Sequence, residues 1–71
     1  MKFFINGENY SVDKVASPVI EDALELFIQA HQASLSFAVA LNGTFVSKDT
    51  YSTTSIAEND TIDVLFPIVG G

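Results

Sequence analysis

The stretch KFFINGENYSV, residues 2–12, decides the fold because it contains two strand-like segments joined by a tight turn. Residues 2–5 are aromatic and β-branched in character, Asn6-Gly7 interrupts them, and residues 9–12 resume the strand-like pattern. Asn-Gly between two such segments is the strongest short-range signal for a β-hairpin, because both residues tolerate the positive φ that the turn requires. We therefore expect the domain to open with an antiparallel hairpin.

A second Asn-Gly pair predicts a second hairpin in the middle of the chain. Residues 37–41 have the composition of a strand, Asn42-Gly43 predicts the turn, and residues 44–47 predict the returning strand. The Thr- and Ser-rich residues 48–56 then predict a crossing loop with a short helical turn.

The last strand is predicted over residues 61–66, after a turn at Glu58-Asn59-Asp60, where Asn and Asp tolerate left-handed backbone geometry. Side chains alternate along a strand. Ile62 and Val64 are therefore expected on one face and Asp63 and Leu65 on the other. Pro67 lacks the N–H that strand pairing needs, so pairing should fade there.

One amphipathic helix is predicted over residues 18–31, with Ser17 as N-cap and Pro18 in the first helical position. Glu21 and Asp22 fall in its early turns, where carboxylates favour the helix dipole. Its apolar face has the spacing of a single helical stripe, formed by Ile20, Ala23, Leu24, Phe27, Ile28 and His31. No second helix of comparable length follows, so a sheet must be its partner.

These elements predict an α+β domain of order β-β-α-β-β-β, with one helix packed on one face of a mixed sheet of four to five strands. This is the β-grasp arrangement of ubiquitin-like proteins. We expect residues 1–66 to form this domain and residues 67–71 to form a flexible C-terminal tail that ends in Gly70-Gly71.

Composition excludes several classes of function. The chain has 71 residues, 48% of them hydrophobic, and no apolar run near the ~20 residues of a membrane span. The first residues turn polar too soon for a secretory signal, so we expect a cytoplasmic protein. The absence of cysteine excludes disulfides, thiolate metal sites and thiol nucleophiles. A net charge of −6 with no arginine argues against nucleic-acid binding and favours a basic protein partner, although acidity also serves solubility.

No catalytic machinery is visible in the sequence. The nine carboxylates form no cluster with metal-ligand spacing, and His31, the only histidine, lies on the apolar face of the predicted helix. No serine lies in a nucleophile elbow, and no glycine-rich loop precedes a helix. The protein is therefore expected to be a substrate or carrier. A docking patch is expected on the outer face of the sheet, formed by Ala38, Ala40, Phe4 and Leu65.

The C-terminal segment LFPIVGG, residues 65–71, supplies the candidate reactive group. Glycine has no Cβ, so a terminal Gly-Gly can pass through a narrow slot and leave its carboxylate open to attack. A frayed chain end without function is the alternative reading of the same residues.

Five features of the sequence together resemble the ThiS sulfur carrier proteins of thiamine biosynthesis. They are the hairpin 2–12, the segment 39–42, Tyr51, the acidic turn 58–60 and the terminal Gly-Gly. MoaD, the small subunit of molybdopterin synthase, is a close relative. Asn59 departs from the family, which usually has glycine between these acidic residues, and a basic residue and Trp are common near Lys48 and Tyr51. FPIVGG, residues 66–71, is also similar to the molybdopterin relative.

The resemblance implies that a ThiF-like adenylating enzyme uses ATP to join AMP to the carboxylate of Gly71. Sulfur from a desulfurase then displaces AMP, and the thiocarboxylate serves a ThiG-like thiazole synthase. Gly70 would thread the active site, Ile68 and Val69 would line its channel, Phe66 would anchor the base of the tail, and Leu65 would contact the partner. No bound cofactor is implied. The alternatives are a MoaD-like sulfur donor, a β-grasp interaction module and a ubiquitin-like modifier.

Overall fold

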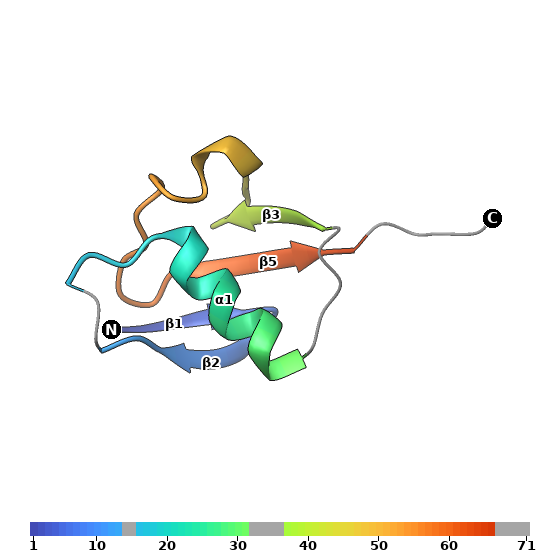
Figure 1. The fold of residues 1–71 in the computed structure, drawn as a ribbon. Helices are drawn as coiled ribbons and strands as arrows, with labels where there is room; N and C mark the ends of the chain where they lie inside the picture. The colour runs from blue at the N-terminus through green and yellow to red at the C-terminus, as the bar shows by residue number, and fades with distance from the viewer. Residues whose placement is uncertain (14–15, 32–36, 67–71) are drawn as a thin grey trace.

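The computed structural model describes residues 1–13, 16–31 and 37–66. The elements are β1 (Lys2–Ile5), β2 (Glu8–Ser11), α1 (Ile20–His31), β3 (Ala38–Leu41), β4 (Thr44–Val46), the short 3-10 helix η1 (Lys48–Thr50) and β5 (Thr61–Leu65). The strands form one sheet in the order β2-β1-β5-β3-β4, and α1 lies across one face of it (Figure 1). β1 and β5 are parallel and the other neighbours are antiparallel. The predicted α+β, β-grasp arrangement is confirmed.

Both Asn-Gly pairs form the predicted turns. Asn6 and Gly7 have φ values of 51° and 83°, and Asn42 and Gly43 have values of 50° and 85°. Positive φ at both central residues is the requirement of the hairpin turn whose twist matches that of the flanking strands. Asn59, in the predicted acidic turn, also has a positive φ, of 67°.

Helix α1 begins at Ile20, so the prediction that Ser17 is the N-cap and Pro18 the first helical residue was wrong. Val19 forms an antiparallel bridge with Ser55 of the crossing loop, so its backbone pairs with that loop before the helix begins. The side chain of Asp22 closes the first turn by accepting a hydrogen bond from the N–H of Val19 at 2.9 Å. Tertiary pairing therefore overrides the local signal for a helix start.

The first turn of α1 is attached to the segment after η1. The N–H of Ile20 donates to the carbonyl of Thr54 at 2.9 Å, and the N–H of Glu21 donates to the carbonyl of Tyr51 at 3.0 Å. These bonds satisfy two of the helix N–H groups that have no partner within the helix. They also fix the crossing segment against the amino-terminal end of α1.

The core lies between α1 and the sheet. Ile62 and Val64 of β5 are buried, while Leu65 on the opposite face is exposed, as the alternation predicts. Leu26 packs against the core although the predicted stripe omits it. Among the described residues, the buried hydrophobic cluster consists of Phe3, Ile5, Val12, Ile20, Ala23, Leu24, Phe27, Val39, Val46, Ile56, Ile62 and Val64.

Candidate functional site

Strand β5 leads directly into the segment that carries the predicted reactive residues. It lies in the middle of the sheet between β1 and β3, so both of its edges are paired (Figure 1). The predicted site residues 68–71 (Ile68, Val69, Gly70 and Gly71) lie outside the described residues, as does the whole predicted tail 67–71. Of the predicted site residues, Leu65 and Phe66 are described.

The beginning of β5 is held by the asparagine of the second turn. The Oδ1 atom of Asn42 accepts a hydrogen bond from the N–H of Thr61 at 2.9 Å, and its Nδ2 atom donates to Asp60 at 3.0 Å. The backbone N–H of Asn42 donates to the carbonyl of Thr61 at 2.7 Å. The other carboxylate oxygen of Asp60 accepts from the N–H of Ala57 at 2.7 Å, so the turn before β5 is closed by one side chain.

The end of β5 is held by the asparagine of the first turn. β1 ends at Ile5, which lies opposite Ile62, so it offers no strand residue to pair with Val64. Asn6 takes that place with its side-chain amide, which bonds both backbone polar groups of Val64. Both Asn-Gly turns therefore have a second role: each fixes one end of the strand that precedes residues 67–71.

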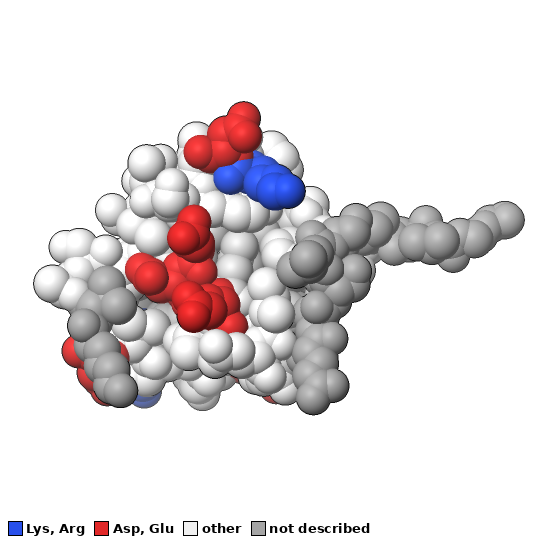
Figure 2. Space-filling model, viewed as in Figure 1, with Lys and Arg blue, Asp and Glu red and all other residues white. Residues whose placement is uncertain are grey.

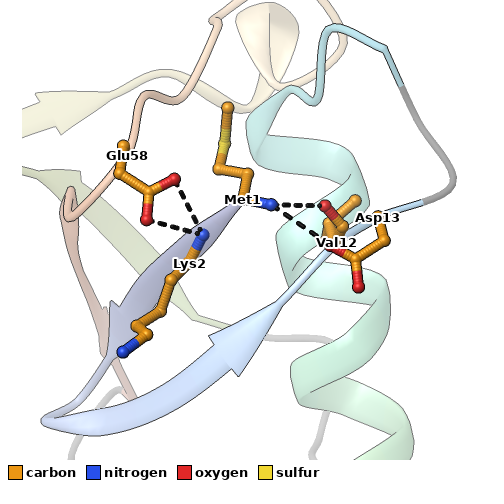
Figure 3. A network of polar contacts seen from close by, with 5 residues as sticks. All are labelled: Met1, Lys2, Val12, Asp13 and Glu58. Atoms are coloured by element: carbon orange, nitrogen blue, oxygen red, sulfur yellow. Dashed lines mark hydrogen bonds and ion pairs between the residues drawn. The ribbon is translucent and has the colours of Figure 1, made fainter.

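Polar contacts also fix the start of β1 (Figure 3). The terminal ammonium of Met1 donates to the carbonyl of Val12 at 3.1 Å and pairs with Asp13 at 3.3 Å. The N–H of Lys2 donates to both carboxylate oxygens of Glu58, at 3.2 and 3.3 Å. The exposed ion pair contributes little stability by itself. Together the contacts join the start of β1 to the end of β2 and to the turn before β5.

Phe66 joins the end of β5 to the helix side of the domain. Its ring stacks on that of Phe27 at 6.3 Å between centroids and meets the ring of Phe37 edge-on at 6.0 Å. Phe27 is buried in α1, whereas Phe66 remains 45% exposed. Aromatic contacts of this kind favour one position of the chain at the base of residues 67–71.

The outer face of the sheet carries exposed apolar side chains beside small ones. Leu65 lies opposite Ala38 in the sheet, and Phe45 lies opposite Ala40. Leu65 is 60% exposed and Phe45 is 70% exposed. The sequence prediction included Ala38, Ala40, Phe4 and Leu65 in this face but missed Phe45, which alternation with the buried Val46 would have placed there. Docking of a partner on this face stays a prediction.

Comparison with known proteins identifies the family. The model of the ThiS family matches residues 4–71. This chain belongs to the ThiS family. No curated protein sequence matches it.

Solved structures agree with this assignment. The crystal structure of a thiamine biosynthesis protein, ThiS, from Geobacter metallireducens has a TM-score of 0.77 and 25% sequence identity, with all of both chains covered. The NMR solution structure of a thiamine biosynthesis protein from the same organism has a TM-score of 0.63 and 22% identity, covers all of this chain and 88% of that one, and supports the fold alone.

Among the described residues of this ThiS-family chain, no group of three or more His, Cys, Asp or Glu side chains is placed to hold a metal ion. Within the same residues, no helix is long and apolar enough to cross a membrane. Tyr10 has a shifted pKa. Burial, with a smaller contribution from the nearby carboxylate of Glu8, raises the pKa of Tyr10 above its ordinary value of 10.0. Its ring stacks on that of Phe3 at 5.9 Å between centroids, and β1 separates its strand, β2, from β5.

Proposed function

We propose that this protein is a sulfur carrier of thiamine biosynthesis and that the carboxylate of Gly71 is its reactive group. The observation that carries the proposal is the match to the ThiS family model, which extends from residue 4 to residue 71 and so includes the Gly-Gly segment. The similar structure from Geobacter metallireducens is that of a thiamine biosynthesis protein, which favours the thiamine pathway over the molybdopterin alternative.

The chemistry begins with activation of the carboxylate. A carboxylate oxygen of Gly71 attacks the α-phosphorus of ATP in the active site of a ThiF-like enzyme, and pyrophosphate leaves. Hydrosulfide then attacks the acyl carbon, the bond to the AMP oxygen breaks, and a thiocarboxylate remains. When the donor is the persulfide of a desulfurase, its terminal sulfur attacks in the same way and displaces AMP. A thiol then reduces the resulting acyl disulfide to the thiocarboxylate.

The residues of this chain present the tail and are not required to catalyse either step. Asn42 and Asn6 form hydrogen bonds to the two ends of β5, and the ring of Phe66 stacks on that of Phe27. These contacts support a fixed starting point for residues 67–71. A fixed base limits the conformations from which the acyl group must reach the partner's active site. In this proposal Gly70 threads the site and residues 68–69 line its channel.

Three protein partners follow from the proposed chemistry. A ThiF-like enzyme binds ATP and activates Gly71, a desulfurase supplies sulfur, and a ThiG-like thiazole synthase receives it. The net charge of −6 with three lysines and no arginine suits basic protein surfaces rather than nucleic acid. The carrier itself binds no cofactor in this scheme.

Intact-mass measurement tests the proposal. The full chain is incubated with the ThiF-like enzyme of its own organism, ATP and sodium sulfide, and we expect one oxygen-to-sulfur exchange in the intact protein. Reactions without ATP, and with a variant that lacks Gly71, should show none. ATP use by the enzyme is measured in the same reactions with and without the carrier. A chain that stimulates ATP use without the mass change, or no stimulation at all, would overturn the proposal.

A further inference from the structure

A groove runs along α1 on the helix side of the domain, between the helix and the segment around η1. Its volume is about 540 Å³. Four of its lining residues are apolar or aromatic: Leu24 and Ile28 from α1, Phe37 just before β3, and Tyr51 just after η1. The helix positions that line it span residues 21–29, which is about 12 Å of helix at 1.5 Å per residue. A groove of this length accommodates one or two apolar side chains of another protein.

Charged side chains lie beside the apolar residues that line the groove. Glu21 and Glu25 lie on the helix side and Lys48 on the side of η1. Figure 2 shows carboxylates gathered over α1 and a basic side chain facing them across an uncharged stretch. Within the described part of the chain, no ion pair links Lys48 to Glu21 or Glu25. The acidic border is therefore available to a Lys or Arg from outside.

The position of the groove relates it to the base of the tail. At the amino-terminal end of α1, the hydrogen bond from Glu21 to Tyr51 joins its two walls. At the other end lies Phe37, whose ring contacts Phe66 at 6.0 Å. The groove is also on the opposite side of the sheet from Leu65 and Phe45, because α1 covers the inner face. An occupant would reach the base of residues 67–71 and leave the outer face uncovered.

We propose that this groove binds the sulfur-donating protein, through a segment that places Lys or Arg beside apolar side chains. The inference rests on the proposed function. An acyl adenylate of Gly71 is held by the adenylating enzyme when sulfur attacks it, so the donor must dock on a surface that this enzyme leaves open. If the adenylating enzyme takes the outer face of the sheet, the groove is such a surface. Its acidic border selects a basic donor segment and aligns it with the tail.

The test compares two sulfur sources on the same adenylated chain. A persulfide-loaded desulfurase from the same organism attacks the acyl adenylate, displaces AMP and leaves an acyl disulfide, whereas sodium sulfide attacks directly and needs no docking. AMP release is measured for both. For the variant Glu21→Lys/Glu25→Lys, we expect the rate with subsaturating desulfurase to fall about tenfold and the rate with sulfide to stay within twofold of the unaltered chain. Both substituted positions are exposed, and a thermal melt checks folding.

Glu8→Lys is the control for charge reversal outside the groove, because it reverses one exposed carboxylate on β2. It should alter neither rate by more than twofold. Docking in the groove would be overturned if the groove variant kept the desulfurase rate of the unaltered chain while sulfide still produced thiocarboxylate. It would also be overturned if the variant lost the same factor in rate with both sulfur sources. Failure of the unaltered chain to gain sulfur from sulfide would instead overturn the proposed function.

Discussion

The side-chain amide of Asn6 pairs with both backbone polar groups of Val64, 58 residues later in the chain. Its Nδ2 atom donates to the carbonyl at 3.2 Å, and its Oδ1 atom accepts from the N–H at 2.8 Å. The amide thus acts as one further residue of β1 at the point where that strand has ended. Asn6, which has a φ of 51° in the turn, therefore also continues the hydrogen bonding of the sheet along its central strand, β5.

Asn6→Ala should destabilise the fold by about 3 kcal/mol. The substitution leaves the N–H and carbonyl of Val64 without these partners, at about 1 kcal/mol for each because both bonds are only partly buried, and places alanine in a left-handed conformation that costs about 1 kcal/mol more. Urea unfolding measures the change. Asn9→Ala, at an exposed position of the neighbouring strand, should stay within about 0.5 kcal/mol. Equal effects of the two substitutions would show that the pairing with Val64 contributes nothing.

Asp60→Ala should cost about 2 kcal/mol, because Asp60 accepts hydrogen bonds from the N–H of Ala57 and the amide of Asn42. Thermal unfolding of the variant is compared with that of Asp49→Ala, which removes an exposed carboxylate from η1. The control should change stability by less than about 0.5 kcal/mol. A small effect at both positions would contradict the role of Asp60 in closing the turn before β5.

Phe66→Ala should destabilise the protein by about 1 kcal/mol through loss of the contacts with Phe27 and Phe37. The value is modest because the ring is 45% exposed. Phe45→Ala removes the same ring from a site that is 70% exposed and should change stability by less than about 0.5 kcal/mol. Chemical denaturation of both variants gives the comparison, and a larger loss for Phe45→Ala would contradict a stabilising role for the ring contacts of Phe66.

Alkaline pH should weaken the fold through Tyr10. Its pKa is raised in the folded protein, so the folded state holds the phenol proton more tightly than the unfolded state does. The resulting stability is fully present below the ordinary pKa of 10.0 and is lost as the pH rises through the higher folded pKa. Unfolding free energies measured from pH 8 to 11 should fall less steeply for Tyr10→Phe than for the unaltered chain. Parallel curves would show that the phenol is not responsible.

Much of this fold could be predicted from short-range signals. Asn42-Gly43 and Asn6-Gly7 specify their turns because the required backbone geometry belongs to those two residues. The alternation in residues 61–66 specifies which side chains are buried. The helix start could not be read in the same way, because Val19 is held by pairing with the crossing loop rather than by its neighbours in sequence.

The candidate site depends on contacts that no local pattern encodes. The amide of Asn6 finds Val64 only after β1 and β5 have paired, and Phe37 meets Phe66 only when β3 lies beside β5. The groove along α1 likewise exists because the crossing segment is attached to the start of the helix. Gly70 and Gly71 could be proposed from sequence because the role proposed for them is chemical and depends on a terminal carboxylate beside residues without side chains.

Fragmentation of the intact reaction product tests the central claim most directly. The chain is treated with its ThiF-like enzyme, ATP and sulfide, and the protein is fragmented in the mass spectrometer without digestion. We predict that every fragment containing the carboxylate of Gly71 carries the oxygen-to-sulfur exchange and that every fragment lacking Gly71 has its unmodified mass. An exchange carried by fragments that end before Gly71, or a product with no exchange at all, would contradict the account.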